Sequence, residues 1–124
     1  MTLLILRAYL TLIQFHIYLV RGDFSGLHRM VRNTETSKRP ANPDAAARIC
    51  AAVDMACIWY WKEVLCLQRS AVTACLLKRH GVPAQMVLGI QQIPFRAHAW
   101  VEVGGRVVND KPYTPEMYAV LDRC

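Results

Sequence analysis

Three side chains in this sequence have the types that nucleophilic catalysis by cysteine requires: the thiol of Cys66, the imidazole of His98 and the carboxylate of Asp110. Such catalysis needs a thiolate, a base close enough to take its proton, and a third group that holds the imidazole in the correct tautomer. A helix N-terminus assists, because its dipole and its free N–H groups favour the thiolate. The test is therefore which cysteine begins a helix.

Of the five cysteines, Cys66 lies at the start of a predicted helix. Cys75 lies in the middle of the same helix among apolar residues, where burial makes a thiol inert. Cys50 and Cys57 lie on the apolar stripe of the preceding helix, and Cys124 is the last residue. Local chemistry thus makes Cys66 a candidate nucleophile, with a structural role as the open alternative.

Four histidines are candidates for the base. His16 and His28 lie in the N-terminal helices, and His80 lies at a helix end, where it is expected to cap carbonyl groups. His98 lies on a predicted strand between two alanines, which leave room beside the imidazole, and it precedes Trp100, whose indole can exclude water. A lone histidine on a strand is often structural, so the case for His98 depends on its pairing with a thiol.

The third member of the site should lie across a hairpin from His98, and the turn at Gly104-Gly105 decides which residue that is. A strict two-residue turn puts Asn109 on the same face as His98. A three-residue loop with a glycine bulge puts Asp110 there instead. Either side chain can orient an imidazole, but Asp110 also stabilises the imidazolium by its charge and is preferred.

The elements that must position these residues follow from hydrophobic periodicity. Helices are expected over residues 3–20, around 27–31, from 43–44 to 59–61, from 66 to 80 and briefly in the tail after Pro112, and strands over 84–90, 96–103 and 106–110. Residues 33–42 are polar and form a loop. The fold class is therefore α+β, with N-terminal helices followed by a small antiparallel sheet.

The first predicted helix carries an aliphatic stripe at three- and four-residue steps. Arg7, Gln14 and His16 interrupt the apolar run, and no small-residue cleavage site follows it. We expect this helix to bury the stripe in the core or to present it to a partner, rather than to be a signal peptide, a membrane span or a membrane-surface helix. The stripe consists of Leu3, Leu6, Leu10, Ile13, Ile17 and Val20.

Composition limits the remaining possibilities. A chain of 124 residues with 54% apolar and 19% charged residues is expected to form a single domain over 1–124, with a helical N-terminal segment (1–34) and a core (43–124). An odd number of cysteines without CxxC spacing predicts reduced thiols in a cytoplasm, without disulfides or zinc. The net charge is +6, but the basic residues are scattered, so nucleic acid is not expected. No phosphate-binding loop is present, and no cofactor or metal is expected.

Four stretches in fixed order resemble a known family: CLQRS at 66–70, LLKRHGVPA at 76–84, PFRAHAWVEV at 94–103 and Asn109-Asp110. Together they resemble the transglutaminase-like leader peptidase of lasso-peptide biosynthesis, over roughly residues 60–120. The resemblance implies a transglutaminase-like or papain-like α+β fold. It also implies that Cys66, His98 and Asp110 are the catalytic residues.

The resemblance further implies a function, a set of partners and a compartment. A cysteine protease of this family removes the leader from a lasso precursor peptide in the bacterial cytoplasm, and a separate cyclase then closes the released core. The chain is too short to include a leader-recognition domain, so a small leader-binding protein is expected as a partner. The alternatives are a transglutaminase or amidase-like enzyme, or a non-catalytic peptide-binding module, on the same fold.

One part of the papain-like pattern is missing. Papain-like enzymes supply an oxyanion-hole donor from a Gln upstream of the cysteine, and this sequence has none in that stretch. Tyr60 and Trp61 are weak candidates for the second donor. Arg69 is expected to pack at the helix surface, with a role in substrate binding as the less favoured alternative.

Overall fold

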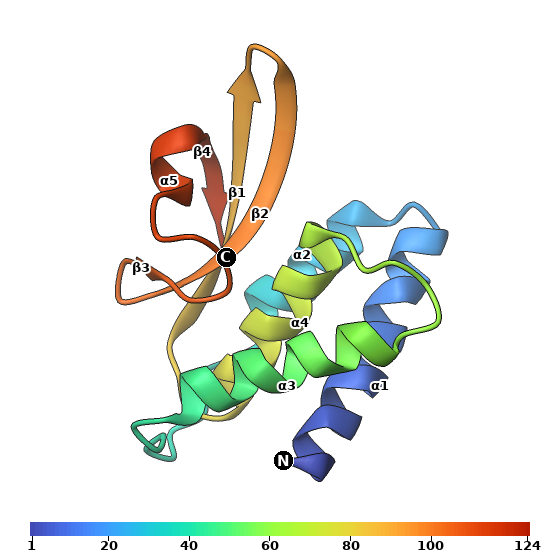
Figure 1. Ribbon diagram of the computed structural model, residues 1–124, viewed down its shortest axis with the longest axis vertical. Helices are drawn as coiled ribbons and strands as arrows, with labels where there is room; N and C mark the ends of the chain where they lie inside the picture. Colours follow the sequence, from blue (N-terminus) through green and yellow to red (C-terminus); the bar gives the residue numbers. More distant parts are fainter.

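Helices come first and strands after them in the computed structural model, which describes residues 1–124 (Figure 1). The elements are α1 (Thr2–Val20), α2 (Phe24–Asn33), α3 (Ala45–Trp59), α4 (Cys66–Arg79), β1 (Ala84–Gln92), β2 (Phe95–Val103), β3 (Arg106–Val107), α5 (Thr114–Met117) and β4 (Ala119–Arg123). The strands form one antiparallel sheet in the order β3-β2-β1-β4. The predicted α+β class is confirmed.

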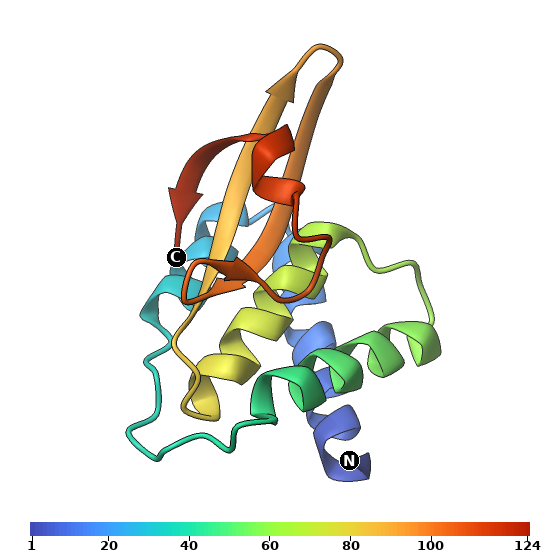
Figure 2. The same ribbon diagram turned by 60° about the vertical axis from the view of Figure 1, so that its left-hand side comes forward.

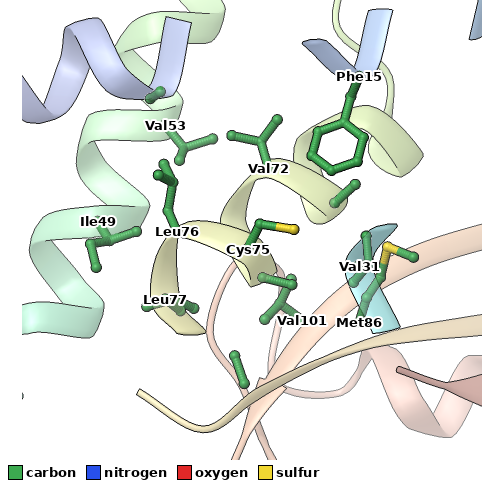
Figure 3. Packing of buried hydrophobic residues seen from close by; sticks show 14 of the residues in the cluster. Phe15, Val31, Ile49, Val53, Val72, Cys75, Leu76, Leu77, Met86 and Val101 are labelled. Atoms are coloured by element: carbon green, nitrogen blue, oxygen red, sulfur yellow. The ribbon is translucent and has the colours of Figure 1, made fainter. Parts of the chain in front are cut away.

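Helix α4 is the centre of the fold and contacts α1, α2, α3, β1 and β2. Its residues Ser70–Lys78 are all buried, so the helix is enclosed on every side rather than along one stripe. Figure 3 shows Cys75 of α4 in the middle of the core, with Phe15 of α1, Met86 of β1 and Val101 of β2 around it. This packing fixes the axis of α4 relative to the sheet.

A buried lysine joins α4 to two other parts of the chain. The Lys78 ammonium group donates hydrogen bonds to the backbone oxygen atoms of Val31 in α2, at 2.9 Å, and of Cys124 after β4, at 2.7 Å. Burial lowers the pKa of this amine, because a low-dielectric environment disfavours its charged form. Lys78 therefore links the second helix, the central helix and the end of the last strand.

Helix α1 does not bury its aliphatic stripe in the core, which was one of the two expected arrangements. Its buried residues are Ala8, Thr11, Leu12 and Phe15. The aliphatic stripe lies on the outer surface instead, with Leu3 63% and Val20 69% exposed, so burial of the stripe in the core is wrong. The helix is apolar on two faces, and the face with Ala8, Leu12 and Phe15 is the one that packs against α3 and α4.

Helix α1 is also the one helix that is long and apolar enough to cross a membrane by length and composition. Only 22% of the relevant window is buried. Core helices and signal sequences pass the same test.

The end of the chain differs from the expected arrangement in two ways. The predicted strand 106–110 ends at Val107, and the short helix expected in the tail is followed by an additional strand, β4, which pairs with β1 through an irregularity at Leu88/Gly89. Figure 2 shows β4 at the edge of the sheet beside β1, with α5 next to it. Five residues without clear alternation gave no sign of a strand.

Candidate active site

Cys66 is the first residue of α4, as predicted. The preceding residue, Leu65, has extended backbone angles (φ −86°, ψ 170°), and the first helical hydrogen bond runs from the Arg69 N–H to the Leu65 carbonyl. The N–H groups of the first turn therefore have no acceptor within the helix. The half-buried thiol of Cys66 lies at the positive end of the dipole of a fourteen-residue helix.

The other four thiols lie in settings that suppress the thiolate. Burial raises the pKa of Cys50 to about 11, and burial is also the largest cause of the raised pKa values of Cys57, Cys75 and Cys124. Cys75 and Cys124 are buried outright. Since the thiolate is the nucleophile, none of these four is suited to attack a carbonyl at neutral pH.

His98 and Asp110 form a hydrogen-bonded pair. His98 Nε2 lies 2.5 Å from Asp110 Oδ2, and the two side chains are 25% and 28% exposed. The other carboxylate oxygen accepts a hydrogen bond from the Lys111 N–H at 2.8 Å. The pKa of Asp110 is lowered: partial burial raises it, but the hydrogen bonds from His98 and Lys111 and the charges of His98 and Arg69 outweigh that effect.

This pairing also sets the tautomer of the imidazole. With Nε2 directed at a carboxylate, the proton of neutral His98 resides on Nε2 and Nδ1 is left with a lone pair. Nδ1 makes no hydrogen bond in the structure, so it is the nitrogen that remains for a proton from a thiol.

Aromatic rings enclose the imidazole. The His98 ring is stacked on Tyr118, with a centroid distance of 5.2 Å, and on Trp100, at 6.0 Å. Trp100 is fully buried and donates a hydrogen bond to the Glu102 carboxylate at 2.8 Å. Gly89 pairs with His98 in the sheet, and a Cβ atom there would lie 2.7 Å from Trp100. The indole therefore borders the histidine, as expected, in a space that only glycine leaves open.

Asp110 reaches His98 by a route that the sequence did not suggest. The turn at Gly104-Gly105 has two residues, with Val103 paired to Arg106 and φ angles of 58° and 79°. The bulge or longer loop on which Asp110 was expected to depend is absent, and that condition was wrong. Asp110 is instead brought to His98 because the chain leaves the sheet before it.

The side chain of Asn109 holds the chain where it leaves the sheet. The Val108 N–H still donates to the Val101 carbonyl at 2.9 Å. The Val101 N–H, however, donates to the side-chain oxygen of Asn109 at 2.8 Å. The side-chain amide of Asn109 thus replaces a backbone acceptor of the neighbouring strand. The next residue, Asp110, therefore does not follow the alternation of side chains between the two faces of the sheet. Asn109, the alternative third member, positions the loop and does not contact His98.

Two residues of α4 fasten this loop, and the sequence did not single them out for that role. The Ser70 hydroxyl donates to the Ala99 carbonyl at 3.0 Å and accepts from the Asn109 amide at 3.1 Å. The Arg69 guanidinium donates to the Asn109 carbonyl and lies 3.4 Å from Asp54 of α3. Both residues follow Cys66 by three or four positions, which places them within one helical turn of it.

The same contacts place Cys66 relative to His98. Ser70 touches Ala99, the neighbour of His98, and Cys66 lies one turn earlier on the same side of α4. In both views the first turn of α4 lies beside the middle of β2 (Figures 1 and 2). No hydrogen bond joins Cys66 to His98. The structure thus pairs His98 directly with Asp110 and places Cys66 on the first turn of the neighbouring helix α4.

The two candidates for a second oxyanion donor, Tyr60 and Trp61, contact helix α1. The rings of Tyr60 and Trp61 pack with His16 of α1, at 6.2 and 5.3 Å. The Gln68 side chain, close to Cys66 in sequence, is buried and donates to the Leu12 carbonyl at 2.8 Å. No hydrogen bond or ring contact joins Tyr60 or Trp61 to Cys66, His98 or Asp110.

Comparison with known proteins places this arrangement in a family. The model of the transglutaminase-like superfamily matches residues 9–123, and the chain belongs to that superfamily. The microcin J25-processing protein McjB of Escherichia coli is 38% identical over 56 residues, which are 45% of this chain and 27% of McjB. The chain thus matches about a quarter of McjB's length. No solved structure is significantly similar to the chain.

Proposed function

We propose that this protein is a cysteine peptidase that removes the leader from a lasso-peptide precursor, with Cys66, His98 and Asp110 as its catalytic residues. The observation that carries the proposal is the His98–Asp110 pair beside the helix that Cys66 begins, because a transglutaminase-like fold uses a cysteine, a base and a carboxylate in this relation. The partial similarity to McjB, a microcin-processing protein, supports a peptide precursor as substrate.

The mechanism is acyl transfer in two steps. His98 Nδ1 takes the Cys66 proton, and the thiolate attacks the scissile carbonyl to form a tetrahedral oxyanion next to the free N–H groups of the first turn of α4. The oxyanion collapses, the C–N bond breaks, and the imidazolium returns the proton to the leaving amine of the core peptide. Water, deprotonated by His98, then hydrolyses the thioester and releases the leader carboxylate and the thiol.

Asp110 has two roles in this proposal. Its hydrogen bond keeps the Nε2 tautomer, so that Nδ1 can act as the base. Its negative charge stabilises the imidazolium between the two proton transfers. We expect the catalytic hydrogen bond from Cys66 to His98 to tighten when substrate binds, as is common for such sites.

The proposed partners follow from the substrate. They are the precursor peptide with its leader and core, a small leader-binding recognition protein, and the lasso cyclase that acts on the freed core. The proposed compartment is the bacterial cytoplasm, which fits the five free cysteines.

Mass spectrometry of a candidate precursor, incubated with the protein and its leader-binding partner, tests the proposal. We expect a single cut between leader and core with the wild-type protein, no cut with Cys66→Ala, and an unchanged cut with the control Cys57→Ala. Cleavage that persists in Cys66→Ala would refute the assignment. Crosslinking or deamidation of the peptide without cleavage would point to a transglutaminase or amidase-like enzyme instead.

A further inference from the structure

A pocket of about 800 Å³ lies at the end of α4 remote from Cys66. Its walls come from the first half of α1, the loop 37–42, the start of α3 and the end of α4. The N-terminus and this loop lie at the same end of the molecule in both views (Figures 1 and 2). We call it the arginine pocket, after four of its lining residues, Arg7, Arg39, Arg48 and Arg79.

The charges of the arginine pocket are uncompensated. None of its four arginines forms an ion pair, and no Asp or Glu lines it. Elsewhere in the molecule Arg32, Arg69 and Arg123 each have a carboxylate partner. Four guanidinium groups around one concavity, without an acid among them, create a local positive potential that attracts anionic groups.

The loop that carries Arg39 is held in place by the end of α4. The Ser37 N–H donates to the Lys78 carbonyl at 2.8 Å. Gly81, with φ +85°, lets the Arg39 carbonyl approach so closely that a Cβ atom on Gly81 would lie 2.2 Å from it. The rim of the pocket is therefore preorganised, which reduces the entropy lost when a ligand binds.

The floor of the arginine pocket is aliphatic. Leu3 and Leu10 of the exposed α1 stripe, Ile49 of α3 and Leu76 of α4 all line it. No Phe, Tyr or Trp is present, so the pocket lacks the large aromatic rings of a typical single-stranded nucleic acid site. Its chemistry fits a chain that alternates carboxylate and aliphatic side chains.

We propose that the arginine pocket is an exosite that binds an acidic, aliphatic segment of the polypeptide substrate. The inference rests on the proposed function, because it takes the substrate to be a peptide cleaved at Cys66. Helix α4 connects the two sites, with Cys66 as its first residue and Arg79 as its last. A helix of this length spans about 20 Å. An extended peptide covers that distance in roughly six residues, so the acidic segment lies at least that far from the cut.

Binding of short peptides tests the exosite without any cleavage. Fluorescence anisotropy measures the affinities of labelled hexapeptides for the Cys66→Ala protein, which cannot cleave them. The peptides have the sequences (Leu-Glu)₃, (Leu-Gln)₃ and (Ser-Glu)₃. We expect (Leu-Glu)₃ to bind most tightly and to weaken as salt rises. The double variant Arg48→Gln/Arg79→Gln should bind it roughly tenfold more weakly, since two exposed ion pairs are lost. The control Arg29→Gln/Arg106→Gln, with the same change in charge outside the pocket, should bind as before.

Competition links the exosite to the substrate. In the wild-type protein (Leu-Glu)₃ should raise the apparent KM for a cleaved precursor and leave kcat unchanged, and Arg48→Gln/Arg79→Gln should lose this inhibition. Equal binding of (Leu-Gln)₃, or equal affinities of the two double variants, would overturn the exosite. The exosite would also be overturned if the peptide did not bind and anionic lipid vesicles bound in a manner that depends on Arg48 and Arg79.

Peptide binding without competition would overturn the assignment to the substrate. Failure of the proposed function is a separate result, because a protein that cleaves nothing can still bind (Leu-Glu)₃ in the manner described.

Discussion

At the scale of single residues, the five cysteines differ in what surrounds their sulfur atoms, and that difference can be measured by alkylation. Burial raises the pKa of Cys50 to about 11 and also that of Cys57, and Cys75 and Cys124 are buried. We therefore expect iodoacetamide at mildly alkaline pH to modify Cys66 first, as read by peptide mapping. First modification at any other cysteine would contradict the assignment, and Cys66→Ala should leave the native protein largely unmodified.

The role of the Asp110 carboxylate can be tested by a single substitution. Asp110→Asn keeps the size of the side chain but loses the charge and lets the imidazole adopt the wrong tautomer. We expect kcat to fall by roughly 100-fold or more, measured on a cleaved precursor. Asp122→Asn removes an acid that also pairs with a histidine, His28, and serves as the matched control. Equal losses in the two variants would exclude a specific role for Asp110.

The same carboxylate makes a pH-dependent contribution to stability. Its pKa is lowered below the ordinary 3.8 in the folded state, so its contribution is present above that value and is lost as the pH falls through the folded-state pKa. Between pH 5 and pH 2 the wild-type protein should lose about 0.5 kcal/mol more than Asp110→Asn, the size expected for a partly exposed pair. Urea unfolding at several pH values measures this, and parallel curves would contradict it.

Which residues of the site could be predicted depended on whether their signal was local. Cys66 was recognisable because a helix start can be read from the residues around it, and His98 because a strand with small neighbours can be read in the same way. The roles of Ser70 and Asn109 could not be predicted from the sequence, because they arise only when α4 is packed against β2. Asp110 was chosen for its charge, and the geometric reason given for it was wrong.

At the scale of elements, strand β1 carries a glycine at the position facing His98. Gly89→Ala would put a Cβ atom 2.7 Å from Trp100 and 2.9 Å from Tyr118, the two rings that hold the imidazole. We expect kcat to fall by roughly tenfold or more, with a loss of stability of about 1–3 kcal/mol from overpacking. Gly104→Ala is the control, because its φ of 58° makes alanine costly while nothing lies near the new atom. An unchanged kcat in Gly89→Ala would refute this account.

The predicted elements agree with the structure where a sequence stretch is long and regular. The helices α1, α3 and α4 and the strands β1 and β2 have the expected types and nearly the expected ends. The short strand β4 was missed, and the strand after the Gly104-Gly105 turn was predicted too long. Short segments at a sheet edge owe their conformation to the strand beside them, and pattern alone does not reveal it.

The outward face of α1 shows a second limit. The helix could be predicted from its periodicity, but both of its faces are apolar, and tertiary contacts decided which of them packs. A stripe such as Leu3, Leu6 and Leu10 reads the same in a core as on a surface.

At the scale of the whole molecule, Lys78 holds three distant parts of the chain together. Lys78→Met keeps much of the side-chain volume but removes the charged donor from the backbone oxygen atoms of Val31, which also accepts from the Thr34 N–H at 3.3 Å, and of Cys124. The free energy of unfolding should fall by about 2–4 kcal/mol, because two buried acceptors lose a charged partner. Urea denaturation measures this, with the exposed Lys62→Met as control. A loss no larger than that of the control would show that these bonds contribute little.

The course of α4, from a surface turn into the enclosed core, has a consequence for amide hydrogen exchange. Amides in the buried stretch from Ser70 to Lys78 should be among the slowest in the protein, since they exchange only when the core opens. The amides of Cys66, Leu67 and Gln68 have no acceptor in the helix and should exchange quickly. A peptide aldehyde that forms a thiohemiacetal with Cys66 should slow these fast amides alone, so that exchange reports directly on the oxyanion site.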